Sequence, residues 1–141
     1  MIRRHFHLAP VVLLIALGVS TLGCGGTSST AGPQGSDLRG LVSLYTSATR
    51  QTGQPPRSEE ELKQFATDQG PQLLERLKVD SVDAIFISPR DGQPYVVMYG
   101  PKNTSGVIAY EAQGVNGIRQ VGDPTGRIRN MNEEQFAELG L

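Results

Sequence analysis

Asp91 and Glu111 are two carboxylates that could together act as an acid and a base, in the manner of glycosidases. Such a pair needs both carboxyl groups on one concave surface, about 5 to 9.5 Å apart. Asp91 lies with Arg90 and two tyrosines in residues 88–100, SPRDGQPYVVMYG. Asp is also a common turn residue, and we interpret Glu111 as a solvated charge at a strand end. We therefore expect no catalytic site in this segment.

The N-terminal segment has the pattern of an export signal. It has a basic head at Arg3 and Arg4, an apolar core over residues 8–22, and a small residue, Gly23, before Cys24. A permanent membrane helix needs about 20 apolar residues, and this run has 15. We therefore expect the first 23 residues to be a signal peptide that the mature protein lacks.

Removal of the signal peptide limits the chemistry of the mature chain. Both histidines, His5 and His7, lie inside it, and Cys24 is the single cysteine of the chain. The mature sequence therefore excludes histidine-based triads, zinc or iron sites built on imidazole or thiolate ligands, and disulfides within the chain. Residues 24–141 hold 11 Lys and Arg against 14 Asp and Glu, with no basic run. We accordingly predict no enzyme, no cofactor, no metal and no nucleic-acid partner.

The four residues that end at Cys24, TLGC, resemble the lipobox of bacterial lipoproteins. In that family the cysteine becomes the first mature residue and carries a diacylglycerol, with an added N-acyl chain in many bacteria. Thr21 and Leu22 stand in the opposite order to the usual lipobox. The resemblance implies an exported protein held in the bacterial cell envelope by acyl chains on Cys24 and facing the periplasm, since two or more chains anchor stably. Ordinary secretion and an uncleaved anchor are the alternatives.

Composition divides the rest of the chain into a linker and one domain. Residues 25–36, GGTSSTAGPQGS, have no charge and almost no apolar side chain, so they cannot bury enough surface to fold. With the lipidated Cys24 they form a flexible linker over residues 24–36, which spans about 20 Å root-mean-square. Residues 37–141 then have the length of a single small domain.

Helical signals come first in this domain. Apolar residues recur at helical spacing over residues 37–52. Ser58 and Glu61 match a capping box, which predicts a second helix, and Pro71 begins the apolar helix pattern PQLLERLKV. A last helix is predicted after Asn132, which is a suitable N-cap.

Strand signals lie between the third and the last predicted helix. They are short segments rich in β-branched and aromatic residues, separated by turn residues such as Gly92. The sequence therefore predicts an α+β fold: an N-terminal helix packed on an antiparallel sheet of about five short strands, with two short helices before the sheet and one at the C-terminus. The predicted strands are 84–88, 95–99, 107–111, 118–122 and 127–131, the first two joined as a hairpin. Three arginines in the late strands, Arg119, Arg127 and Arg129, predict a solvated second sheet face.

The ordered series of GQPPRSEEEL, SPRDGQPY, AYEAQGVNGIRQV and NEEQF is similar to the globular part of prepilin-like proteins and type II secretion pseudopilins. The resemblance implies a helix that runs through a loop into an antiparallel sheet. Some pseudopilins bind calcium through late acidic loops, where Asp123 is the matching residue, but one carboxylate is too few for calcium. True pilins carry a Glu after the processing site, and this chain has none after Arg4, so we do not expect it to polymerise as a pilin.

These observations predict a lipid-anchored envelope protein that presents a small non-enzymatic domain for structural or binding duty. An accessory pseudopilin-like subunit of a secretion or pilus-type machine is the first alternative, with a secretion-system protein as its partner. A carboxylate-based enzyme is the second. Four tyrosines, Tyr45, Tyr95, Tyr99 and Tyr110, could line a ligand groove, although core and sheet-face packing is the interpretation that their spacing favours.

Overall fold

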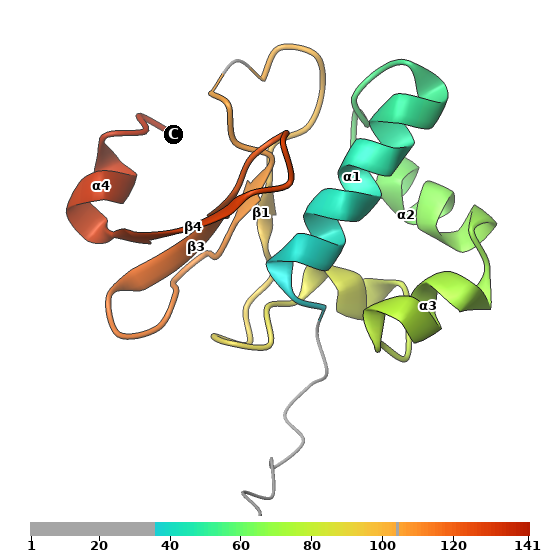
Figure 1. Cartoon of the computed structure of the whole chain (residues 1–141), viewed down its shortest axis with the longest axis horizontal. Helices are drawn as coiled ribbons and strands as arrows, with labels where there is room; N and C mark the ends of the chain where they lie inside the picture. The colour runs from blue at the N-terminus through green and yellow to red at the C-terminus, as the bar shows by residue number, and fades with distance from the viewer. Residues whose placement is uncertain (1–35, 104) are drawn as a thin grey trace, which may run out of the picture.

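Residues 36–103 and 105–141, which the computed structural model describes, form three helices, a four-stranded antiparallel sheet and a closing helix (Figure 1). The strands follow one another in the order β1-β2-β3-β4. The α+β architecture predicted from the sequence is confirmed. Its elements are α1 (Leu38–Thr52), α2 (Glu59–Asp68), α3 (Pro71–Leu77), the 3-10 helix η1 (Asp83–Phe86), β1 (Val96–Val97), β2 (Ala109–Tyr110), β3 (Ile118–Gly122), β4 (Ile128–Asn132) and α4 (Glu133–Ala137).

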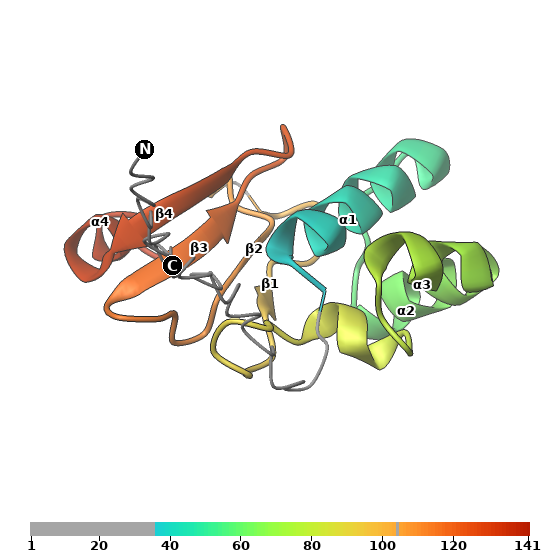
Figure 2. The same cartoon turned by 60° about the horizontal axis from the view of Figure 1, so that its bottom comes forward.

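The long helix α1 lies between the sheet and the other two N-terminal helices. Figures 1 and 2 both show α2 and α3 on the side of α1 that faces away from the sheet. Local sequence fixes both ends of α1: the Asp37 carboxylate accepts a hydrogen bond from the Gly40 amide at 2.8 Å, and Gly53 ends the helix with a φ of 77°. A positive φ of this kind favours glycine. The leading helix therefore packs on one sheet face, as predicted.

Glycine allows α1 to approach the sheet closely. A Cβ atom on Gly122 of β3 would lie far inside the van der Waals contact distance of Val42 Cγ2 on α1. The backbone of Gly122 has no positive φ, so space rather than conformation selects glycine at this position. The Val42 side chain of α1 therefore packs directly on the backbone of β3 at this point.

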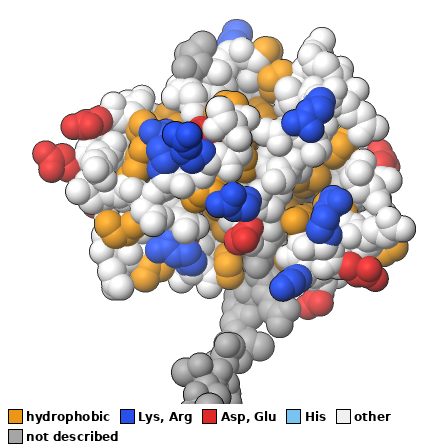
Figure 3. Space-filling model, viewed as in Figure 1, with side chains coloured by type: hydrophobic (Ala, Val, Ile, Leu, Met, Phe, Trp, Pro, Cys, Tyr) orange, Lys and Arg blue, Asp and Glu red, His pale blue; other side chains and the backbone are white. Residues whose placement is uncertain are grey.

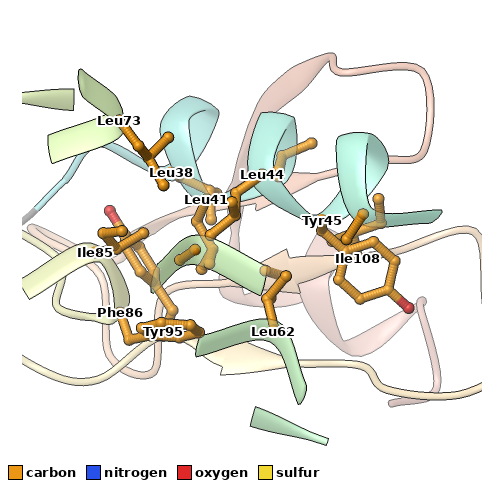
Figure 4. Packing of buried hydrophobic residues seen from close by; sticks show 14 of the residues in the cluster. Leu38, Leu41, Leu44, Tyr45, Leu62, Leu73, Ile85, Phe86, Tyr95 and Ile108 are labelled. Carbon is orange, nitrogen blue, oxygen red and sulfur yellow. The ribbon is translucent and has the colours of Figure 1, made fainter. Parts of the chain in front are cut away.

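The main core joins α1, α2, η1 and the inner sheet face. Its apolar side chains interlock around α1, whose residues Leu41 and Val42 are fully buried (Figure 4). Burial of such side chains is the dominant stabilising contribution to a small domain. Besides Leu41, the members of this cluster that Figure 4 labels are Leu38, Leu44, Tyr45, Leu62, Leu73, Ile85, Phe86, Tyr95 and Ile108.

A second, smaller core lies on the opposite sheet face, where α4 covers it. Val121 and Met131 are buried there against Phe136 and Leu139. The Arg119 guanidinium lies 4.7 Å from the centre of the Phe136 ring, so its charge is held over an aromatic face. The prediction of a solvated second face is therefore wrong where α4 packs, because the arginine stems and the helix together cover the apolar side chains.

The predicted strand over residues 84–88 is wrong. Most of it belongs to the 3-10 helix η1, and only Ile87 pairs like a strand, in an isolated bridge with Pro94. Ile85 and Phe86 are consecutive, and both are buried in the same core. Consecutive strand residues would point to opposite faces, so a helical turn suits this pair better. The sheet consequently has four strands.

The turn after Ile87 is confirmed. The Gly92 amide donates to the Ser88 carbonyl oxygen, the Ser88 amide donates to that of Gln93, and Gly92 has a φ of 69°. Of the other predicted strands, 118–122 matches β3 in full, 127–131 is one residue early, and those around β1 and β2 are too long.

The N-terminal predictions lie outside the described residues. They are the signal peptide over residues 1–23, lipidation at Cys24 and most of the linker 24–36. Within residues 36–103 and 105–141, every helix is too short or too polar to cross a membrane.

Candidate functional site

The Glu111 carboxylate is fully buried at the end of β2, where it is the centre of a polar cluster. It accepts hydrogen bonds from Arg90 Nη1 at 2.7 Å, from the Gln120 backbone amide at 2.8 Å and from the Ser88 hydroxyl at 3.2 Å. The Glu111 amide also donates to the Gln120 carbonyl oxygen at 3.0 Å. The interpretation of Glu111 as a solvated charge is therefore wrong, because Arg90 and the neighbouring strand provide the partners that a buried carboxylate needs.

Ser88 connects this carboxylate to the turn. Its hydroxyl donates to Glu111 and accepts from the backbone amides of Arg90 and Asp91, at 3.2 and 3.4 Å. A serine at the first position of a turn commonly accepts from amides two and three residues later. The same local geometry that folds the turn thus delivers Arg90 to Glu111.

Asp91 joins the turn to the loop between β2 and β3. Its carboxylate accepts from the backbone amide of Gln93 at 3.1 Å and from those of Gln113 and Gly114 at 3.2 and 2.8 Å. Burial opposes ionisation, but the three amide hydrogen bonds together hold the pKa of Asp91 below its ordinary value. Gly114 has a φ of 74°, a conformation that favours glycine at the point where the loop meets the carboxylate.

The structure thus brings Asp91 and Glu111 into one cluster through Ser88. Each carboxylate accepts hydrogen bonds from at least one backbone amide, and Glu111 is enclosed on all sides. Both groups act here as acceptors that tie the turn to the sheet. This arrangement crosslinks two loops and offers no open surface on which both carboxylates could meet a substrate.

The four tyrosines pack as core and sheet-face side chains, as predicted. The Tyr45 hydroxyl donates to the Met98 carbonyl oxygen and the Tyr95 hydroxyl to that of Ser36, each at 3.0 Å. Burial raises the pKa of Tyr45, Tyr95 and Tyr99. Within the described residues, the buried Tyr99 hydroxyl has no hydrogen-bond partner. Tyr110 lies edge-on to a ring of α4 on the opposite face of the sheet.

Asp123 caps the turn between β3 and β4. Its carboxylate accepts from the Thr125 hydroxyl and from the backbone amides of Thr125 and Arg127. The Thr125 hydroxyl is the main cause of a pKa below the ordinary value. In the part of the chain that the structure describes, no three His, Cys, Asp or Glu side chains gather as metal ligands would.

A cavity of about 340 Å³ lies between the C-terminal half of α1 and the loop that follows β1. Sequence reasoning named Tyr45 as a possible groove residue but none of the other lining residues. On α1, Thr49 follows Tyr45 by four positions, and Arg50 follows Thr46 by four positions. This pattern marks one side of a helix, but the opposite wall comes from distant segments that spacing along one helix cannot reveal. Its lining residues are Tyr45, Thr46, Thr49, Arg50, Pro55, Gly100, Pro101, Asn103, Ile108 and Pro124.

Basic side chains are spread over the face of the molecule that Figure 3 shows. Figure 3 shows Lys and Arg spread over both halves of this face, with apolar patches between them and most acidic groups towards its edges. The described residues carry more acidic than basic side chains in total.

Comparison with known proteins found no match to a protein family, to a curated protein or to a solved structure.

Proposed function

We propose that this protein is an exported lipoprotein of a bacterial cell envelope. Acyl chains on Cys24 anchor it in the membrane, and its α+β domain faces the periplasm and serves a non-enzymatic structural or binding role. The sequence TLGC before an uncharged tract supports the anchor. The observation that carries the proposal is the way in which the domain holds Ser36, twelve positions after Cys24.

Ser36 is fixed to the domain from two sides. Its backbone amide donates to the Ala84 carbonyl oxygen at 3.0 Å, and its own carbonyl oxygen accepts from the Tyr95 hydroxyl at 3.0 Å. Ser36 is 1% exposed. Ser36 was predicted to be the last residue of the flexible linker, and its burial corrects that bound, because the folded domain already includes it. Fixation of this kind where the linker meets the domain suits a tethered domain, because the attachment point is buried rather than a fraying helix end.

The non-enzymatic role is supported by the polar cluster around Ser88. The carboxylates of Asp91 and Glu111 form the acid and base pair that the sequence offers, and both accept hydrogen bonds from the backbone. A general acid or base must be within hydrogen-bond reach of its substrate, which an enclosed carboxylate is not. The cluster is therefore best explained as the contact that holds the turn and the sheet together.

Metabolic labelling tests the anchor. Cells that express the full chain are fed an alkyne-tagged fatty acid, and the protein is isolated and probed for the tag. We expect label on the wild type and on the control variant Ser28→Ala, and none on Cys24→Ala. Equal labelling of Cys24→Ala, or an unlabelled wild type, would contradict the proposal.

An accessory subunit of a secretion or pilus-type machine is a second candidate. The observation that favours it is the packing of the long helix α1 across a meander of antiparallel strands (Figure 1). This packing agrees with the arrangement that the sequence resemblance to pseudopilin domains implies. This candidate predicts that mild crosslinking in cells captures secretion or filament components together with the wild type. Failure to recover such components, with the protein present at normal level, leaves the independent envelope protein as the better account.

A further inference from the structure

The cavity beside α1 has an apolar floor and apolar walls. Tyr45 and Ile108 form the floor, where they lie next to each other in the core (Figure 4). Pro55, Pro101 and Pro124 contribute walls from three separate segments. Proline rings and an aromatic face offer rigid apolar surface, so a guest that fills this cavity orders few side chains.

One cation stands at this apolar cavity. Arg50 is exposed in the last turn of α1, and within residues 36–103 and 105–141 it forms no ion pair. None of the described lining residues is Asp or Glu. A ligand with one negative charge therefore complements this lining.

The threonine hydroxyls of the lining already donate within the protein. The Thr46 hydroxyl donates to the Val42 carbonyl oxygen at 3.0 Å, and the Thr49 hydroxyl donates to that of Tyr45 at 2.9 Å. The Asn103 amide nitrogen donates one of its two hydrogens to the Val107 carbonyl oxygen. Arg50 thus offers the charged donors of this site, in a planar fork that matches a carboxylate.

Two features reduce the negative charge at the end of α1. The Gly53 amide donates to the Thr49 carbonyl oxygen at 2.9 Å, which satisfies one of the carbonyl groups of the last turn. Arg50 lies in the same turn, where its positive charge opposes the negative end of the helix dipole.

We propose that this cavity binds a free small carboxylic acid with an apolar body, of the aryl- or alkyl-carboxylate class. The apolar part lies on Tyr45 and Ile108 between the prolines, and the carboxylate pairs with Arg50. A volume of about 340 Å³ suits a ligand of this size. The inference concerns the folded domain and does not depend on lipidation of Cys24.

The probe for the test is 3-phenylpropionate, with 3-phenylpropionamide as the matched neutral ligand. Full-length protein is purified from the cell fraction that contains it. If that fraction is the membrane, the protein is reconstituted in lipid nanodiscs, and empty nanodiscs measured in parallel correct for partitioning of the probe into lipid. Calorimetry and saturation-transfer NMR then measure binding. We expect the acid to bind about tenfold more tightly than the amide, because a charge-assisted pair replaces a neutral contact.

Two variants locate the binding. Arg50→Gln removes the cation from an exposed helix position, and it should weaken binding of the acid about tenfold while leaving the amide unchanged. Thr49→Phe fills the cavity and should abolish binding of both ligands. The control Arg39→Gln changes an exposed arginine in the first turn of the same helix and should have no effect.

Three results would overturn the inference. They are no binding of the acid at millimolar concentration, equal affinity of acid and amide, and unchanged affinity in Arg50→Gln. A short peptide with a C-terminal phenylalanine provides the last comparison. Binding of this peptide without binding of the free acid is a case of the first result, and it would identify a site for polypeptide ends instead.

Discussion

Arg90 and Glu111 form an ion pair whose two members differ in exposure. Arg90 Nη1 lies 2.7 Å from Glu111 Oε2, and the glutamate side chain is fully enclosed while the arginine side chain is 32% exposed. The pair is set by the turn at Ser88, whose hydroxyl contacts both the carboxylate and the Arg90 amide. A buried anion with one cation is sensitive to the loss of that cation.

Replacement of Arg90 should therefore destabilise the protein strongly. In Arg90→Ala the Glu111 carboxylate keeps its bonds to Ser88 and Gln120 but loses its counter-charge, and we expect a loss of about 2 to 3 kcal/mol in the free energy of unfolding. Urea unfolding measures it. The control Arg39→Ala, an exposed change on α1, should stay within about 0.5 kcal/mol of the wild type. Equal stability of the two variants would contradict the role of the pair.

The tyrosine hydroxyls give a matched pair of variants. Tyr95→Phe removes the donor to the Ser36 carbonyl oxygen and should cost about 1 kcal/mol. Tyr99→Phe removes a buried hydroxyl that has no partner within the described residues, so it should be neutral or slightly stabilising. Chemical denaturation of both variants distinguishes them. A larger loss in Tyr99→Phe than in Tyr95→Phe would show that the attachment of Ser36 contributes little.

Asp91 predicts a dependence of stability on acid. Its pKa is lowered in the folded state, so the carboxylate stabilises the fold at neutral pH, and this stabilisation is lost as the pH falls from about 4 through the lowered pKa. Asp91→Asn should be about 1 kcal/mol less stable than the wild type at pH 7, and the difference should shrink towards pH 2. Thermal unfolding across this range tests the sign. A difference that grew on acidification would refute the assignment.

Gly122 tests the close approach of α1 and β3. A methyl group at this position would collide with Val42 Cγ2, so Gly122→Ala should cost about 1 to 3 kcal/mol. Val42→Ala opens space at the same point. The double variant should therefore be more stable than the sum of the two single losses predicts, by at least about 0.5 kcal/mol. Strict additivity in urea unfolding would indicate that the two residues do not meet.

Local signals predicted the helices well. The N-caps predicted at Ser58 and Asn132 both form, because each needs residues only three positions apart. The capping box predicted for Ser58 and Glu61 forms only in part, since the Glu61 carboxylate accepts from the Arg57 amide and not from that of Ser58.

The predicted strand over residues 84–88 failed because its conformation depends on more than local sequence. A strand would point Ile85 and Phe86 to opposite sides, whereas the 3-10 helix buries both in the core around α1. The position of α1 therefore decides between the two conformations, and local sequence does not show that position.

Local sequence signals could not predict the polar cluster or the cavity either, because both depend on contacts between residues far apart in the sequence. Glu111 contacts Ser88 and Arg90 from more than twenty positions away, so nothing next to it in the sequence indicates its burial. The cavity likewise combines α1 with proline-bearing segments that only the tertiary fold brings together. Residue type suggested which groups could do chemistry, whereas long-range packing decided which of them became structural.

Intact mass spectrometry of the native protein, extracted from membranes, tests the central claim most directly. The lipid-anchored account predicts the mass of residues 24–141 plus a diacylglycerol on Cys24, with or without a further acyl chain, and the loss of this species in Cys24→Ala. A native mass without acyl chains, or one that still includes residues 1–23, would contradict it.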